Sequence, residues 1–175
     1  RILRGKRGRE RAGLLTGLAD LGRLAYVQNL PARAESLMRE AVVEGKAAGL
    51  TEQPKYQSVL NNLAIVLFDR GAVGEALEIH QGLLELRLRQ FGPVHRRVQL
   101  TRINLGNLLA ARANYEEALE QARVALTLDS LLAGQGASRR AVILQNMASF
   151  LDALGDFAAG RRLLEEAIVV RPAGT

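Results

Sequence analysis

The chain has 175 residues, of which 48% are hydrophobic and 4% aromatic, and it contains no Cys or Trp. This composition allows one compact domain or a short solenoid built from small aliphatic side chains, and it excludes disulfides and thiolate metal sites. The net charge of +6 at pH 7 is concentrated in residues 1–11, where six Lys and Arg side chains accompany Glu10 alone, so the rest of the chain is nearly neutral.

Residues 1–11 form a basic segment, for which we expect either a solvated tail or the end of a preceding element. Binding of nucleic-acid phosphates is a less favoured alternative, because no aromatic side chains interleave with the charges to stack on bases. No signal-peptide pattern follows, and the longest apolar run, near residues 63–68, is too short to span a bilayer. We therefore expect no membrane partner and a cytoplasmic location.

Residues 12–175 repeat themselves with a period of 42 residues. The phrase Asn62-Leu63-Ala64 recurs as Asn104-Leu105-Gly106 and Asn146-Met147-Ala148, and Asp20-Leu21-Gly22 stands one period earlier. Such self-similarity is typical of stacked supersecondary units that share one core. We predict a single domain of four units, at about residues 14–50, 56–92, 98–134 and 140–172.

Each unit reads as two helices joined by a turn. In the second unit, Leu60, Leu63 and Leu67 follow the i, i+3, i+7 spacing of an apolar helix face, and a second apolar face begins at Ala76. Between them, Gly71 can end the first helix in a left-handed conformation. No alternating strand pattern occurs, so the sequence predicts an all-α fold of about four antiparallel helix hairpins. The same turn position in the other units holds Asn29, Ala113 and Gly155.

Small residues recur where the two helices of a unit would pack together. Helices approach closely only where one of them offers little side chain, and large neighbours then fill the space above and below. We expect larger residues at these positions to overpack the hairpin at a cost of about 1–3 kcal/mol. The positions hold Ala64, Gly106 and Ala148 in the first helices, and Ala76, Ala118 and Gly160 in the second helices.

No arrangement of catalytic residues stands out, and both histidines have structural explanations. His80 falls at a position that is apolar in the other three units, so we expect it to pack in the core, and His95 precedes a helix that it would cap or orient. Gly134 and Gly136 follow a helix and lack a P-loop Lys, which indicates a linker. We therefore predict no enzymatic activity, no metal site and no cofactor.

The spacing of apolar and small residues resembles the tetratricopeptide repeat. The resemblance rests on Leu63-Ala64, Leu67, Gly71, Val73, Ala76 and Leu83. The period of 42 residues, the phrase 60–64 and the linker 91–95 are similar to the kinesin-light-chain-type branch. The resemblance implies a right-handed α-α superhelix in which the first helix of each unit lines a concave groove. Arg102 departs from the pattern, since it replaces a large apolar residue.

The candidate binding face consists of first-helix residues that point away from the apolar stripe. It includes Asn62, Asn104 and Asn146, with Asp20 as a fourth rung of the same ladder. These amides could pair with the backbone of a bound peptide, as the resemblance implies, or bond to a neighbouring helix and fix the repeat geometry. The full set is Arg23, Ser58, Asn61, Asn62, Ile65, Asp69, Ile103, Asn104, Asn107, Gln145, Asn146 and Ser149, with Ala19 on the same face of the first unit.

The sequence therefore predicts a scaffold that binds a protein or peptide segment in the groove. One family ligand, a terminal carboxylate held by paired charges, is disfavoured because Ile103 and Asn107 replace the second pair. The alternative is a regulatory or sensory domain that controls an attached ATPase, protease or DNA-binding domain. The chain starts at Arg1 and prefers Arg over Lys, so we interpret it as part of a larger, bacterial protein. Further repeats, another domain or a second copy would cover the uncapped ends.

Overall fold

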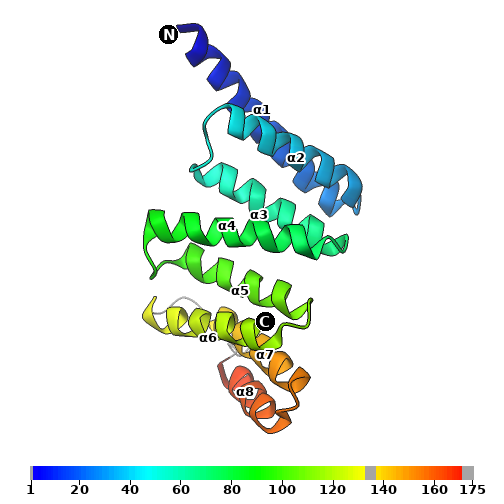
Figure 1. The fold of residues 1–175 in the computed structure, drawn as a ribbon, viewed down its shortest axis with the longest axis vertical. Coiled ribbons are helices and arrows are strands. Elements are labelled where there is room, and N and C mark those ends of the chain that lie inside the picture. The colour runs from blue at the N-terminus through cyan, green and yellow to red at the C-terminus, as the bar shows by residue number, and fades with distance from the viewer. Residues whose placement is uncertain (1, 133–136, 171–175) are drawn as a thin grey trace. The chain divides into compact units, whose positions relative to one another are not determined.

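The computed structural model describes residues 2–132 and 137–170, and within these ranges it contains eight α-helices and no strand (Figure 1). The predicted all-α fold is confirmed. The helices are α1 (Ile2–Val27), α2 (Pro31–Ala47), α3 (Pro54–Asp69), α4 (Val73–Phe91), α5 (Arg96–Ala110), α6 (Tyr115–Leu131), α7 (Ala137–Ala153) and α8 (Phe157–Val170). The chain forms two compact units, Arg1–Leu83 and Leu84–Thr175.

Residues 2–11 of the basic segment form the first turns of α1, which begins at Ile2 and is 26 residues long. The side chains before Arg9 lie outside the described part of the chain, and so does the linker expected at Gly134 and Gly136. Pro31 and Pro54 begin α2 and α3, where a missing N–H costs no intrahelical hydrogen bond.

Successive helices of each unit pack as neighbours. In the first unit α1 packs against α2, and α3 packs against both of them. In the second unit α5 packs against α6, α6 against α7, and α7 against α8. The core of the last hairpin gathers Ala141 and Leu144 from α7 with Ala167 from α8, and Leu126 of α6 packs against this cluster.

The turn inside each hairpin has the same geometry in all four repeats. The turn residue is left-handed, with φ of 58° at Asn29, 81° at Gly71, 60° at Ala113 and 86° at Gly155. The next amide then donates to a carbonyl five residues earlier, as in Leu30 to Ala25 and Asn114 to Leu109, both 2.9–3.0 Å. This pattern satisfies carbonyls at the helix end that would otherwise have no partner. The predicted turn position is confirmed.

The expected close approach within the hairpins is also present. A Cβ at Gly22 would lie 2.9 Å from Cγ of Met38, and one at Gly106 would lie 3.2 Å from the carbonyl oxygen of Ala118. A Cβ at Gly160 would lie 3.1 Å from the carbonyl oxygen of Ala148. These helices therefore meet almost backbone to backbone at their small residues, and only short side chains fit there.

Both histidines take the structural roles expected from the sequence. His80 is buried in the core, with 2% of its surface exposed. His95 is the N-cap of α5, where its Nδ1 accepts a hydrogen bond from the amide of Arg97 at 3.1 Å. Its ring also stacks on Phe91, with a centroid distance of 4.3 Å. His95 thus fixes the linker that leads into the third repeat.

Candidate binding faces of the first helices

The predicted binding residues lie on two faces, one formed by α1 and α3 and the other by α5 and α7. Helices α1 and α3 contact each other, and so do α5 and α7. Exposed members of the set are Arg23, Ser58, Ile65, Asp69, Asn107, Gln145 and Ser149, whereas Asn61, Asn62, Ile103, Asn104 and Asn146 are half-buried.

One expectation about these faces is wrong. Ala19 is buried, with 7% of its surface exposed, and cannot contact a ligand on the surface of α1. It follows the buried Leu15 by one helical turn and precedes the buried Gly22 by another. It therefore extends the packed stripe of α1 and does not lie opposite that stripe.

On the α5–α7 face, one rung of the asparagine ladder bonds directly to the preceding repeat. Nδ2 of Asn146 on α7 donates to Oδ1 of Asn107 on α5 at 2.8 Å. On the same two helices, Leu100 and Val142 expose 42% and 47% of their surfaces, and Gln145 is exposed. The face therefore combines amides with aliphatic side chains.

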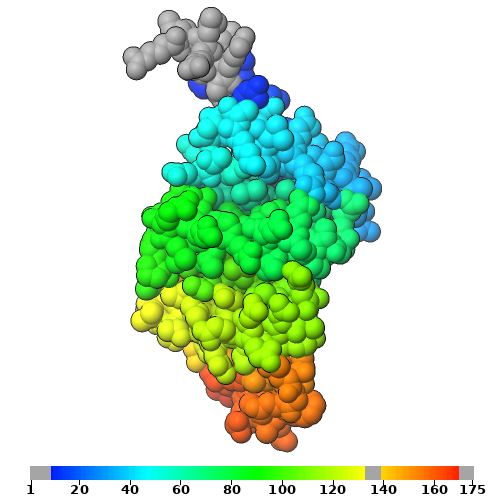
Figure 2. All heavy atoms as spheres, viewed as in Figure 1, coloured from blue at the N-terminus to red at the C-terminus, as the bar shows by residue number. Residues whose placement is uncertain are grey.

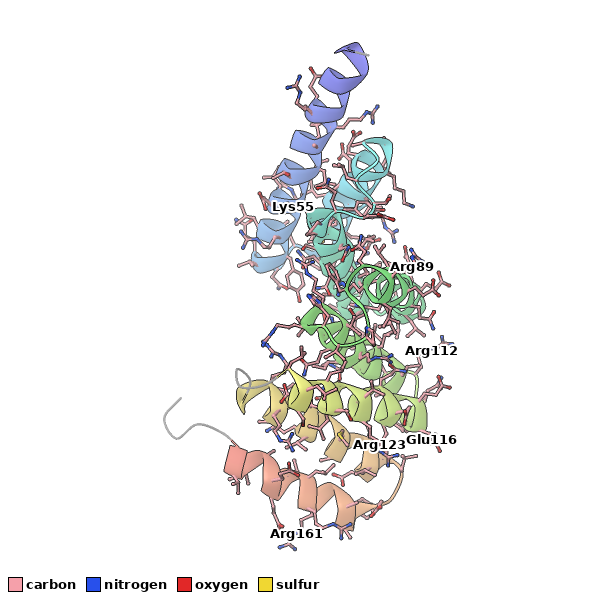
Figure 3. The ribbon with its side chains drawn as sticks, turned by 90° about the vertical axis from the view of Figure 1, so that its left-hand side faces the viewer. Lys55, Arg89, Arg112, Glu116, Arg123 and Arg161 are labelled. Carbon is pink, nitrogen blue, oxygen red and sulfur yellow. The ribbon has the colours of Figure 1, made fainter. Side chains whose placement is uncertain are left out.

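On the α1–α3 face, ionic and phenolic contacts replace the amide pair. Nζ of Lys55 lies 3.3 Å from Oδ1 of Asp20, and Figure 3 labels Lys55 at the start of α3 beside α1. The hydroxyl of Tyr26 donates to Asp69 at 2.5 Å. This hydrogen bond, together with partial burial and the charge of the carboxylate, raises the pKa of Tyr26. Asp20 and Asp69 are thus engaged between the first two repeats.

Arg102 shows how the third repeat accommodates a charged residue in its apolar stripe. The side chain is half-buried, and its Nη1 donates to Oε1 of Gln121 on α6 at 2.7 Å. Removal from water lowers the pKa of Arg102. The aliphatic stem can occupy the space of the missing apolar residue while the guanidinium reaches Gln121. Arg102 therefore serves packing and is not part of the binding face.

A charged network on the second helices was not anticipated from the sequence. Arg39 on α2 forms two hydrogen bonds of 2.6 Å with the carboxylate of Glu75 on α4 and one of 2.7 Å with Glu35. Glu35 in turn accepts a hydrogen bond from Arg70. The bond from Arg39 lowers the pKa of Glu75. The network connects the first repeat to the second. Its only sign in the sequence was the opposite charge of these residues, at positions where the residue type varies among the repeats.

The described residues contain no group of three or more His, Cys, Asp or Glu side chains that could hold a metal ion. Within the same residues, no helix combines the length and apolar character needed to cross a membrane. The α5–α7 face offers hydrogen bonding and apolar contact, and the α1–α3 face adds charged side chains.

Two sequence models of one family match the chain, at residues 56–130 and 146–166, and both describe the tetratricopeptide repeat. The chain is a tetratricopeptide repeat protein. The repeats confirm the resemblance seen in the sequence, and this family consists of scaffolds for protein–protein interaction that are typically non-catalytic. No curated protein matches the sequence significantly.

Solved structures place the chain among tetratricopeptide repeat solenoids. It is similar to the crystal structure of BtubC (BKLC) from P. vanneervenii, with a TM-score of 0.81 and 21% identity over 92% of this chain and 67% of that chain. A Podosopora anserina protein of the kinesin light chain kind, with nearly identical TPR-like repeats, gives a TM-score of 0.79 and 18% identity over 94% and 75%. MamA gives 0.65 and 13% over 89% and 77%. At these identities the likeness establishes the fold.

Proposed function

We propose that this tetratricopeptide repeat protein holds an extended segment of a partner protein on the α5–α7 face. The observation that carries the proposal is the Asn146–Asn107 hydrogen bond of 2.8 Å, on a face that also exposes the aliphatic side chains of Leu100 and Val142. An amide pair bonded in this way still has a donor, Nδ2 of Asn107, and an acceptor, Oδ1 of Asn146. A peptide unit offers the complementary carbonyl and amide groups, so the pair matches any extended backbone.

The partner segment should carry apolar side chains and little charge. Leu100 and Val142 occupy the same place in successive repeats and are both exposed, so each can contact a different side chain of one extended segment. The residues predicted on this face include no Lys, Arg, Asp or Glu, and therefore nothing there selects a charged peptide. A site of this kind gains affinity from backbone pairing and specificity from its apolar contacts.

The test is a selection of random peptides on the purified chain, followed by affinity measurements on substituted proteins. The double substitution Asn107→Ala and Asn146→Ala should weaken binding about tenfold or more, because two hydrogen bonds to the ligand backbone are lost. Arg123→Ala on α6 is the matched control, since Arg123 is exposed on the second helix of the third repeat. Circular dichroism should show unchanged helicity in both proteins.

Two outcomes of these measurements would contradict the proposal. Equal affinities of the double variant and the parent chain, or an equal loss with Arg123→Ala, would show that the α5–α7 face does not hold the peptide. A fall in melting temperature without a fall in affinity would assign the amide pair to repeat geometry alone.

A further inference from the structure

The outer face of α8 is exposed at positions that are covered in α6, the second helix of the repeat before it. Phe157, Leu164 and Ile168 expose 68%, 40% and 73% of their surfaces, and they follow one stripe of the helix together with Arg161. The corresponding stripe of α6 is Tyr115, Leu119, Ala122 and Leu126, which is buried or half-buried. Leu126 packs on Ala141 and Leu144 of the next repeat, so this is the stripe by which a repeat contacts its successor. Figure 2 shows atoms of α8, in red and orange, at the molecular surface.

A second apolar stripe is exposed on α1. Leu14, Leu21 and Leu24 expose 53%, 52% and 50% of their surfaces. The same places in α3 hold Tyr56, Leu63 and Val66, each no more than 3% exposed. Tyr56 reaches Gly45 on α2, where it would clash with an added Cβ, so this is the stripe by which a repeat contacts its predecessor.

The two exposed stripes therefore correspond to the two sides of the contact between successive repeats. Inside the first unit a second-helix stripe meets a first-helix stripe where α2 packs on α3, and inside the second unit α6 packs on α7 in the same way. We propose that copies of this chain associate head to tail, with the α8 stripe of one copy packed on the α1 stripe of a second copy as if the repeats continued. Because the α8 stripe and the α1 stripe differ, two joined copies still expose one free stripe of each kind. Further copies can therefore add in a row.

The charges beside the two stripes support a second copy as the occupant. Between the first two repeats, Glu35 and Arg39 of α2 and Glu75 of α4 form a Glu–Arg–Glu series. The same three places at a head-to-tail junction hold Arg161 and Glu165 of α8 and Arg33 of the second copy. This is the same series with every charge reversed, and it is again complementary.

These charged groups are accessible in a single copy. Arg161 and Glu165 already pair at 2.9 Å, with side chains 82% and 60% exposed, and Figure 3 shows Arg161 projecting from α8. Arg33 is exposed as well. Glu165 can therefore accept a second arginine without first breaking a buried contact, just as Arg39 binds two glutamates.

Sedimentation velocity of the 175-residue chain over a range of micromolar concentrations tests the proposal. The parent chain should show association that grows with concentration into species larger than dimers. Arg33→Glu and Glu165→Arg should each weaken association about tenfold, because each places like charges at the junction. An equimolar mixture of the two variants should associate again, because both kinds of junction between unlike variants bring opposite charges together. One junction pairs the unchanged Glu165 with the unchanged Arg33, and the other pairs the two introduced charges.

Two further variants keep the outcome unambiguous. Ile168→Asp should abolish association with helicity intact, because Ile168 is exposed in the single copy, and Arg123→Glu on α6 should leave association unchanged. A parent chain that stays monomeric, or single charge variants that associate as well as their mixture, would overturn the proposal. The substituted residues lie outside the α5–α7 face, so peptide binding measured on the same samples succeeds or fails independently.

Discussion

Two helical glycines illustrate how the surroundings of a residue decide the effect of one methyl group. A Cβ at Gly45 would overlap the ring of Tyr56 and lie 2.5 Å from Cδ1 of Leu15, whereas a Cβ at Gly82 would meet nothing within 4 Å. We expect Gly45→Ala to lower the free energy of unfolding by about 1–3 kcal/mol through overpacking. Gly82→Ala should raise it by about 0.5–1 kcal/mol through helix propensity. Urea unfolding of both variants checks the prediction, and effects of the same sign would contradict it.

The need for glycine at position 45 could not be predicted from the repeat. The same place in the next two units holds Arg87, which is buried, and Asp129, which is half-buried. Periodicity therefore indicates that the position faces the next repeat but gives no preferred size. The limit comes from the bulk of Tyr56 and Leu15, which occupy this site only in the first unit. The repeat pattern of the sequence therefore does not predict the size of a residue that contacts a partner in another repeat.

At the level of elements, one of the four hairpin turns holds a residue that is unfavourable in the left-handed conformation. Ala113 adopts φ of 60°, while glycine occupies the same position at Gly71 and Gly155. An L side chain in this region costs about 1 kcal/mol, and glycine removes that strain at the expense of some unfolded-state entropy. We expect Ala113→Gly to raise the free energy of unfolding by about 0.5 kcal/mol, measured by urea denaturation.

The neighbouring Ala111 provides the control for this turn. It caps α5 in a right-handed conformation with φ of −64°, so glycine gains nothing there. Ala111→Gly should therefore destabilise the protein by about 0.5–1 kcal/mol. A stabilising effect at position 111, or none at 113, would show that the left-handed turn stores no strain.

Helices and turns were predictable because they repeat, whereas the particular partners of the polar side chains were not. Four turns with one geometry follow from one sequence position, and that position was predicted. The asparagine ladder was read as uniform, yet Asn146 bonds to Asn107 while Asp20, at the equivalent place, pairs with Lys55. The polar partner of each ladder position depends on the side chains of the adjacent first helix, and these side chains change from repeat to repeat.

At the scale of the whole molecule, head-to-tail association would make stability depend on protein concentration. A contact made only by folded copies stabilises the folded state by mass action. Above the dissociation constant, each tenfold rise in concentration should add about 1.4 kcal/mol per junction, which raises the melting temperature by about 3–6 °C for a chain of this size.

Thermal unfolding of the parent chain, followed by circular dichroism at several concentrations, measures this dependence. Arg33→Glu should flatten it, because the introduced carboxylate would face Glu165 across the junction, while Arg123→Glu should leave the slope as in the parent. At the lowest concentration all three proteins should melt together, since Arg33 and Arg123 are exposed in the single copy. Melting temperatures that do not change with concentration would mean that the leucines of α1 and the apolar stripe of α8 stay in water, and that the repeats of this chain do not continue into a second copy.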